Sequence, residues 1–239
     1  MSDVPVLILA GGRGERLAGM TDLPKPLLDI QGRPFLGYLL DLLSAAGMRR
    51  VFFLTGYRGD LFPGRLAAEL RDHPQLETSF LREEEPLGTG GALARALPFV
   101  DTRALVMNGD SYCAIDCAAF LRFHAREPER LALTAVEIES AADFGSLDLD
   151  GEELRGFREK AAANRGWINA GVYVLPRAAL ASIPAVGSSL ERDLLPRWIA
   201  ERPGRAYRTR AYFCDIGTPE RYALARRELP ERAKRGESG

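Results

Sequence analysis

The sequence has no surplus of charge of either sign. Lysine and arginine together number 32, and aspartate and glutamate number 33, which leaves a formal net charge of -1 over 239 residues. A nucleic-acid-binding protein should show a basic surplus, so any positive charge that matters here must be local. The apolar run at 4–10 follows no basic segment and is too short for a signal peptide or a membrane span. We therefore expect no nucleic-acid partner and no membrane partner.

Cysteine and histidine are also scarce. The three cysteines, Cys113, Cys117 and Cys214, are odd in number and lack zinc-type spacing, which predicts buried, reduced thiols in a cytoplasmic protein. The two histidines, His73 and His124, lie outside every motif, and we expect them at helix ends on the surface. No serine elbow and no Cys/His pairing is present, so covalent catalysis is not indicated.

Strand-like and helix-like segments alternate through the first half of the chain. Apolar strands are predicted at 4–10, 50–55, 76–81 and 104–108, and helices at 34–46, 59–71, 89–97 and 116–125. This alternation predicts an α/β fold, a Rossmann-like mixed and mostly parallel sheet with helices on both faces.

The pattern changes after about residue 130. Strands are predicted at 131–139, 146–149, 166–175 and 205–214, and helices at 189–201 and 219–228. These segments predict that the second half extends the same sheet, so we expect a single domain over 1–228. Residues 229–239 are charged and poor in apolar residues, which predicts a flexible C-terminal tail.

The loop GGRGERL, residues 11–17, follows the first strand. A dinucleotide-binding fingerprint would need a third glycine where Leu17 stands, and a Walker-type loop would need a closing Gly-Lys-Ser/Thr, so neither pattern fits. A simple tight turn would also use glycines. Local charge favours a ligand instead, because exposed backbone amides with Arg13 and Arg16 beside them can bind an anion.

Lys25 stands between two prolines, in the sequence PKP. Proline fixes its own φ angle and biases the preceding residue toward extended geometry, so we expect this lysine on a stiff, extended backbone. A cation presented in this way suits polyphosphate, where it can stabilise the charge that develops during phosphoryl transfer.

Two aspartates follow predicted strands. Asp110 ends the segment ALVMNGD, and Asp215 lies in FCDIG. Ligands of open α/β sheets bind beyond the carboxyl ends of the strands, and Mg²⁺ is often held there by one or two carboxylates with phosphate oxygens. The residues alone also allow Asp110 to cap the following turn.

Six segments in order resemble the signature of the sugar-phosphate nucleotidylyltransferases, also called NDP-sugar pyrophosphorylases. They are LAGGRGERL with PKPLLDI, EPLGTGGA, NGDSY, FREK, WINAGVYVL and FCDIGTPERY, and they extend over about residues 4–228. Among the members, EPLGTGGA and SLERDLLP most resemble the D-glycero-D-manno-heptose 1-phosphate guanylyltransferases.

This resemblance implies a nucleotide-binding half at about 1–130 and a sugar-binding half at about 131–228. It implies catalytic roles for Arg16 and Lys25, and Mg²⁺ as a cofactor on Asp110 and Asp215. It implies nucleotide contacts from Leu9, Ala10, Gly11, Gly12, Arg13, Gly14, Glu85, Pro86, Gly88, Thr89 and Gly109. It implies sugar-phosphate contacts from Gly145, Glu159, Lys160, Asn169 and Gly171.

The implied reaction joins GTP to D-glycero-D-manno-heptose 1-phosphate and releases pyrophosphate. Mannose 1-phosphate guanylyltransferase and N-acetylmuramate 1-phosphate uridylyltransferase are alternatives within the same class. A non-catalytic nucleotide-sensing subunit is a third alternative, and Leu17 disfavours a Rossmann oxidoreductase. Both a monomer and a homodimer are compatible with the sequence.

Overall fold

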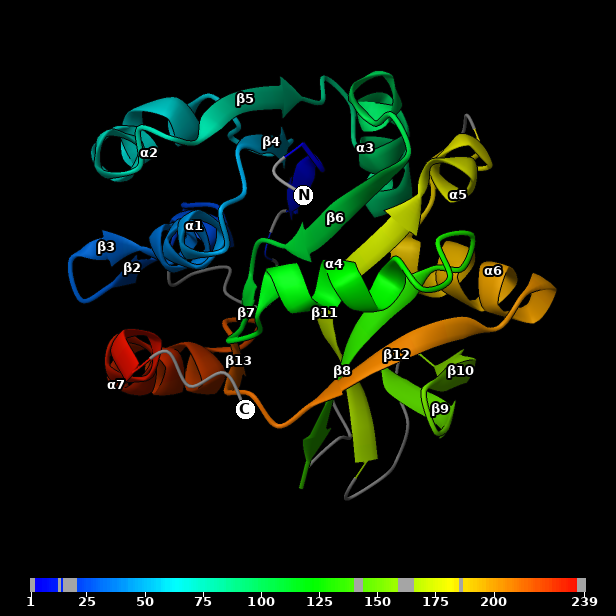
Figure 1. Cartoon of the computed structure of the whole chain (residues 1–239). Helices are drawn as coiled ribbons and strands as arrows, with labels where there is room; N and C mark the ends of the chain where they lie inside the picture. Colours follow the sequence, from blue (N-terminus) through cyan, green and yellow to red (C-terminus); the bar gives the residue numbers. More distant parts are fainter. Residues whose placement is uncertain are drawn as a thin grey trace.

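A nine-stranded mixed sheet forms the centre of the computed structural model, which describes residues 3–12, 14, 21–139, 144–158, 166–184 and 187–235. From one edge to the other the strands are β5 (Glu77–Arg82), β4 (Arg50–Thr55), β1 (Val6–Ala10), β6 (Arg103–Asn108), β11 (Gly166–Pro176), β8 (Ala132–Ile138), β12 (Gly204–Thr209), β10 (Glu153–Arg158) and β9 (Ser146–Asp150) (Figure 1). The pairs β5–β4, β4–β1, β1–β6 and β8–β12 are parallel, whereas β11 is antiparallel to both neighbours. The predicted α/β fold with a mixed sheet is confirmed.

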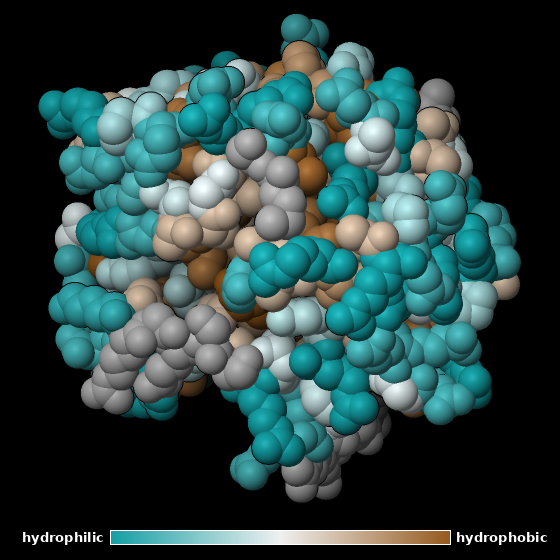
Figure 2. Space-filling view, in the orientation of Figure 1, coloured by the Kyte–Doolittle hydropathy of each residue, from teal (hydrophilic) through white to brown (hydrophobic). Residues whose placement is uncertain are grey.

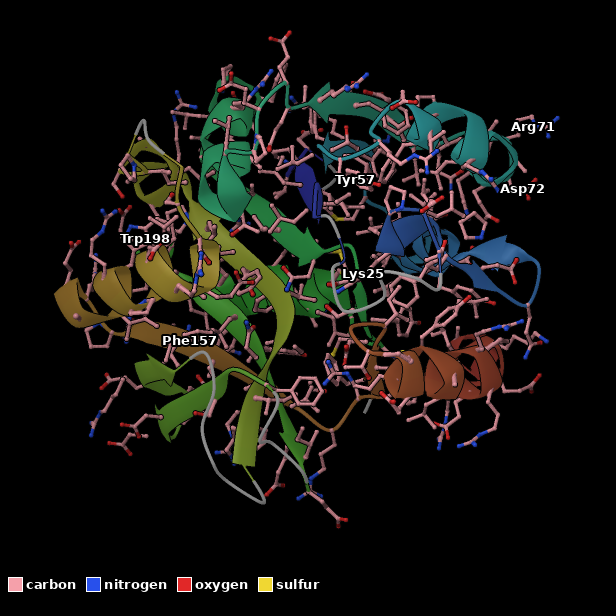
Figure 3. The ribbon with its side chains drawn as sticks, turned by 180° about the vertical axis from the view of Figure 1, so that it is seen from behind. Lys25, Tyr57, Arg71, Asp72, Phe157 and Trp198 are labelled. Carbon is pink, nitrogen blue, oxygen red and sulfur yellow. The ribbon has the colours of Figure 1, made fainter. Side chains whose placement is uncertain are left out.

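Helices cover both faces of this sheet, as Figures 1 and 3 show from opposite sides. One face packs against α1 (Phe35–Ala45), α2 (Leu61–Asp72), α4 (Cys117–His124) and α7 (Pro219–Arg235). The other packs against α3 (Gly88–Ala96), α5 (Arg177–Ala181) and α6 (Leu195–Glu201). Short helical turns are η2 (Lys25–Leu27), η3 (Leu97–Phe99) and the π-helical η4 (Leu190–Leu194). Because side chains alternate along a strand, Val6 and Ile8 face the first core layer and Leu7 faces the second.

Two small two-stranded sheets complete the fold. One pairs β2 (Asp29–Ile30) with β3 (Arg33–Pro34), and the other pairs β7 (Ser111–Cys113) with β13 (Phe213–Asp215). The prediction of one strand over 205–214 is therefore wrong. The main-sheet strand stops at Thr209, whose hydroxyl accepts a hydrogen bond from the Ala211 N–H (3.0 Å), and the chain then joins the second small sheet.

The C-terminal helix is longer than the sequence predicts. α7 continues to Arg235, so the expected flexible tail is wrong for residues 229–235. Leu229 is fully buried, and the Tyr222 hydroxyl donates to the Asp29 carbonyl (2.7 Å), which attaches the helix to the β2–β3 hairpin. Packing of this apolar stripe maintains the helix through Pro230, which local propensity would disfavour.

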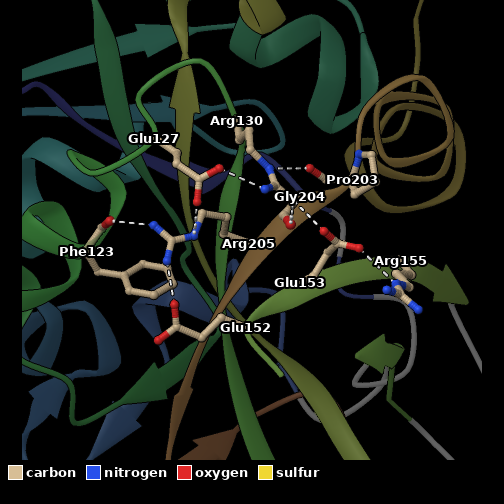
Figure 4. Close-up of polar contacts among 9 residues, drawn as sticks. All are labelled: Phe123, Glu127, Arg130, Glu152, Glu153, Arg155, Pro203, Gly204 and Arg205. Carbon is tan, nitrogen blue, oxygen red and sulfur yellow. Dashed lines mark hydrogen bonds and ion pairs between the residues drawn. The ribbon is translucent and has the colours of Figure 1, made fainter. Parts of the chain in front are cut away.

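The buried Arg205 connects β12 to the end of α4 and to the β9–β10 turn (Figure 4). Its guanidinium donates to the Phe123 carbonyl (3.1 Å) and lies 4.0 Å from the centre of that ring. It also pairs with Glu127 (3.1 Å) and with Glu152. A buried charge requires such partners, so this cluster fixes the far end of the sheet.

The face seen in Figure 1 is mostly hydrophilic, with apolar side chains visible only in small areas between hydrophilic ones (Figure 2). Among the described helices, none combines the length and the apolar character needed to cross a bilayer.

Cys113, Cys117 and Cys214 are buried and form no disulfide, as predicted. Both histidines lie at helix ends, as expected, but the expected surface position is wrong for His124, and His73 is half-buried. His124 is fully buried with its Nδ1 atom 3.1 Å from Nη1 of Arg103, and Nε2 of His73 lies 2.9 Å from a carboxylate oxygen of Asp41. Burial, followed by the positive charge of Arg103, lowers the pKa of His124 to about 4.

This buried imidazole predicts a specific loss of stability in mild acid. Above pH 6.5 His124 is neutral in both the folded and the unfolded chain, whereas below that pH only the unfolded chain binds the proton. A folded-state pKa of about 4 against an ordinary 6.5 therefore removes about 3 kcal/mol from the free energy of unfolding by pH 4. Urea titrations from pH 7.5 to 4 should show a shallower decline for His124→Gln than for the wild type. If the free energy of unfolding falls equally with pH in the two proteins, His124 is not the group responsible for the loss of stability.

Candidate functional site

The carboxyl ends of β1 and β6 are in direct backbone contact, with glycine and no intervening side chain at the contact. The Gly109 N–H donates to the Leu9 carbonyl (2.9 Å), and a Cβ at Gly109 would lie only 2.7 Å from that oxygen. Beyond Ala10, a Cβ at Gly11 would come within 3.3 Å of the Gly56 nitrogen. Glycine is needed at position 109 because the strand ends approach too closely for a side chain, and at position 11 a side chain would be tightly packed against the neighbouring backbone. Gly12, by contrast, faces open space.

Lys25 lies beside this glycine loop, near the centre of the view from behind (Figure 3). A Cβ at Gly14, which has φ +67°, would lie 3.0 Å from Cγ of Lys25, so the aliphatic stem passes directly over the glycine. The ammonium reaches to 3.5 Å from Oδ2 of Asp110, and the lysine side chain is 16% exposed. The prediction of an extended backbone at Lys25 is wrong, because this residue begins the 3-10 turn η2. The rigid presentation comes instead from Pro24 before the turn and Pro26 within it.

The two predicted carboxylates lie at one end of the small β7–β13 sheet, with Asp215 in β13 and Asp110 directly before β7. Asp215 is the register partner of Ser111, and the Ile216 N–H donates to the Asp110 carbonyl (3.0 Å). Oδ1 of Asp215 accepts a hydrogen bond from the Gly217 N–H (2.7 Å) and forms an ion pair with Nε of Arg221 (2.9 Å). Burial, and to a lesser degree the charge of Asp110, raises the pKa of Asp215 against the opposing effect of Arg221.

This donor set fits a hard divalent cation. Asp110 and Asp215 are oxygen donors of like charge, and the charge of Asp110 adds to the burial that raises the pKa of Asp215, so a divalent cation between them would offset their repulsion. In the part of the chain that the structure describes, no group of three His, Cys, Asp or Glu side chains is arranged to hold a metal. Mg²⁺ commonly retains water and takes substrate phosphate oxygens in addition to one or two carboxylates, so two suffice.

The loop Leu87–Gly90 at the start of α3 docks on the segment that leads into η4. The Gly90 N–H donates to the Ser188 carbonyl (2.8 Å), the Ser188 N–H donates to the Leu87 carbonyl (3.1 Å), and the Leu190 N–H donates to Oγ1 of Thr89 (2.7 Å).

Gly88 in this loop has φ +72°, and a Cβ there would lie 2.5 Å from the Ser188 oxygen. Glu85 and Pro86 are exposed at the loop's entrance. Glu83, which the sequence did not single out, accepts from the Leu87 N–H (3.3 Å), and burial raises its pKa. The loop is therefore a fixed backbone surface rather than a flexible connection.

A chain of polar side chains lies on the other side of the site. Nδ2 of Asn169 donates to the Tyr173 hydroxyl (2.7 Å), which donates to Oε1 of Glu191 (3.2 Å). Nδ2 of Asn108 donates to the same oxygen (3.4 Å). Gly171, with φ +75°, forms part of a bulge in β11, and its N–H donates to Oδ1 of Asn169 (3.1 Å).

The structure thus gathers most of the predicted residues around one region. The Gly145 carbonyl accepts from the Asn169 N–H (2.9 Å), which places that glycine beside the same chain. Four predicted residues lie outside the described residues, namely Arg13, Arg16, Glu159 and Lys160. Asn108, Ser111, Tyr173 and Glu191 were missed as site residues, although the motifs NGDSY, WINAGVYVL and SLERDLLP contain them.

A cavity of about 670 Å³ lies elsewhere. Its lining includes Pro5, Arg103 and Pro176, at the amino ends of β1 and β6, whereas the glycine loop and the aspartates lie at the carboxyl ends. In an α/β sheet the carboxyl ends are the expected ligand side, so this cavity is not the candidate site.

Comparison with known proteins shows that the chain is similar to nucleotidyl transferases. The family model described as Nucleotidyl transferase matches residues 5–232. A mannose-1-phosphate guanylyltransferase of Mycobacterium tuberculosis is 34% identical, over 99% of this chain and 68% of the relative. A D-glycero-alpha-D-manno-heptose 1-phosphate guanylyltransferase of Aneurinibacillus thermoaerophilus is 29% identical, over 93% of this chain and 97% of the relative.

Solved structures agree with this grouping. The crystal structure of HddC from Yersinia pseudotuberculosis has a TM-score of 0.83 and 35% identity, and covers 95% of this chain and 99% of its own. The same protein complexed with GMP-PN has a TM-score of 0.82.

The close packing at Gly171 can be tested with a matched glycine. A Cβ at Gly171 would lie 2.6 Å from Oγ of Ser111 and 2.9 Å from Nδ2 of Asn108, whereas one at Gly151, with φ +61°, would meet no atom within 4 Å. Both alanine variants carry the strain of a left-handed backbone, about 1 kcal/mol, and Gly171→Ala adds overpacking for a total of roughly 3 kcal/mol. Urea denaturation measures both losses. Equal destabilisation of the two variants would refute the close packing.

Proposed function

The chain belongs to the nucleotidyl transferase family, and from this premise we propose that it joins a nucleoside triphosphate to a sugar 1-phosphate, releasing pyrophosphate. The observation that carries the proposal is the 3.5 Å approach of Lys25 to Asp110 beside the glycine-rich end of β1. Bare amides and a fixed cation suit a triphosphate, and paired carboxylates suit the cation that accompanies it.

The proposed chemistry is a displacement at the α-phosphorus. A phosphate oxygen of the sugar 1-phosphate forms the new bond to that phosphorus, the bond from it to the β-phosphate bridging oxygen breaks, and pyrophosphate leaves with the electron pair. The attacking oxygen is already anionic, so no general base is required. The positions of His73 and His124, in contacts with Asp41 and Arg103 respectively, agree with this chemistry.

The protein's main task is to bring two polyanions together and hold them in line. We assign Lys25 to the negative charge shared between donor and acceptor near the α-phosphate, since its stem and ammonium are fixed by Gly14 and Asp110. Arg16 is assigned to the triphosphate and Lys160 to the incoming phosphate, on the resemblance of their motifs. Asp110 and Asp215 would hold Mg²⁺, which when bound offsets the charge of the reacting phosphates.

The substrates proposed are GTP and D-glycero-D-manno-heptose 1-phosphate. Support comes from the 29% identical relative of that activity and from the 35% identical structure complexed with GMP-PN. Mannose 1-phosphate is the second candidate acceptor, because the 34% identical relative is named for it. Three unpaired, buried cysteines suit a reducing compartment, so we propose the cytoplasm.

Product identification tests the proposal directly. The protein is incubated with GTP, ATP, UTP and CTP, Mg²⁺ and a set of sugar 1-phosphates that includes the heptose, mannose and N-acetylmuramate compounds. Mass spectrometry should find one nucleoside diphosphate sugar, GDP-heptose, together with pyrophosphate. Another product would reassign base or sugar, and no product with any pair would favour a nucleotide-sensing subunit.

Lys25→Ala should lower kcat by on the order of a hundredfold while the protein remains folded, because an oriented charge acts mainly in the transition state. Pyrophosphate release gives the rate, and circular dichroism verifies the fold. Lys234→Ala, which removes the same group from an exposed position on α7, serves as the control and should retain full activity. Unchanged turnover in Lys25→Ala would remove this residue from the mechanism.

Asp110→Asn should abolish Mg²⁺-dependent turnover, because the amide is a weaker metal ligand and carries no charge. Titration of MgCl₂ after treatment with EDTA should restore activity to the wild type only. If the variant regains its activity at the same Mg²⁺ concentration as the wild type, Asp110 is excluded as a metal ligand.

A further inference from the structure

Glu191 has no role in the function proposed above, yet it is the end point of the polar chain in the site. It receives hydrogen bonds on Oε1 from Tyr173 (3.2 Å) and from Asn108 (3.4 Å). Burial, and to a smaller extent the charge of Asp110, raises its pKa, so Glu191 and Asp110 are within electrostatic reach. The residue therefore borders the place where the reaction is proposed.

The four hydrogen-bonded side chains of this polar group, Asn169, Tyr173, Glu191 and Asn108, differ in their exposure to solvent. Tyr173 is fully buried, whereas Glu191, Asn108 and Asn169 each retain partly exposed surface. An amide carries two donors and one acceptor group, and a carboxyl group has two oxygens. Among the described residues, the hydrogen bonds of these side chains use one donor of each asparagine, the oxygen of Asn169 and one oxygen of Glu191. The second donor of each asparagine and the second carboxyl oxygen remain for a ligand.

The backbone that carries Glu191 is held on both sides. The Ser189 N–H donates to Asp193 (2.7 Å) and the Ser189 hydroxyl accepts from the Arg192 N–H (3.2 Å), which fixes the start of η4. The Leu190 N–H donates to Oγ1 of Thr89 (2.7 Å), which fixes the same segment to the first turn of α3. A side chain mounted in this way has little freedom to lose when it binds a ligand.

We propose that Glu191 binds hydroxyl groups of the acceptor sugar and determines which sugar 1-phosphate is accepted. This inference rests on the proposed function. The negative charge at Glu191 disfavours the phosphate of the acceptor, so the sugar ring faces Glu191 and Asn169 while the phosphate faces Lys25. A carboxylate that accepts from sugar hydroxyls forms charge-assisted hydrogen bonds, which are stronger than neutral ones.

A site built to hydrogen-bond a hydroxyl also discriminates against ligands that lack it, because its own polar groups then remain unpaired. Tyr173 acts in this arrangement as a positioning residue, since its hydroxyl holds both Glu191 and Asn169 in place without surface of its own.

The test compares Glu191→Gln with Glu201→Gln, the same change at an exposed position on α6. Steady-state kinetics are measured with GTP and with mannose 1-phosphate, glucose 1-phosphate and their monodeoxy analogues as named acceptor probes. For Glu191→Gln we expect kcat/KM for the acceptor to fall by about 10- to 100-fold, with KM for GTP within about twofold of the wild type. The control should match the wild type for both substrates.

The preference for the intact sugar over one monodeoxy analogue should shrink in Glu191→Gln, which a purely structural role would not produce. Tyr173→Phe, which keeps the ring and removes only the hydroxyl, should shift the preference in the same direction and provides the measurement if Glu191→Gln fails to fold. If the folded variants keep the acceptor preference of the wild type, or lose kcat/KM equally for GTP and for the acceptor, the inference about Glu191 is overturned while the proposed function stands. A wild-type protein that releases no pyrophosphate with any pair would overturn the proposed function as well.

Discussion

Electrostatic repulsion is the constraint on which this site depends. Asp215 ends β13, Asp110 directly precedes the paired strand β7, and the proposed substrates add further negative charge to the same region. In the described chain the opposing charges nearest to them are Lys25, 3.5 Å from Asp110, and Arg221, 2.9 Å from Asp215. Each carboxylate therefore has one cationic partner, and the divalent cation proposed for this site would offset the remaining negative charge.

The fold supplies this arrangement by unusually close backbone contacts. Glycine at position 109 lets the end of β6 approach the end of β1, and the separate β7–β13 sheet then carries Asp215 to Asp110 across more than a hundred residues of sequence. The β7–β13 sheet packs into the apolar core on one face of the main sheet through Tyr112, Cys113 and Cys214. Glycine at position 109 allows the strand ends near the charged groups to approach closely.

Local signals in the sequence were sufficient to predict the main helices and strands, but they could not predict contacts between segments that are distant in sequence. Periodicity predicted the strands that became β1, β4 and β6 because they are continuously apolar. It missed the break at Thr209, where pairing with β7 overrides a locally regular alternation, and it missed the helix beyond Leu229, where tertiary packing overrides composition. Lys25 and Asp110 were recognised because each stands in a motif with obvious chemistry.

Glu191 shows why the rest could not be predicted. Alone in sequence it is one acid among 33, beside an arginine and an aspartate that suggest a solvated helix face. Its environment arises only when η4 packs against β11 and β6, which brings Tyr173 and Asn108 to the same oxygen. In the function proposed here, the nucleotide contacts come largely from backbone, which is insensitive to side-chain replacement, whereas the contacts proposed for the sugar come from side chains of three elements. Substitutions within such a fold can therefore change the sugar that is accepted while the phosphate-binding geometry is retained.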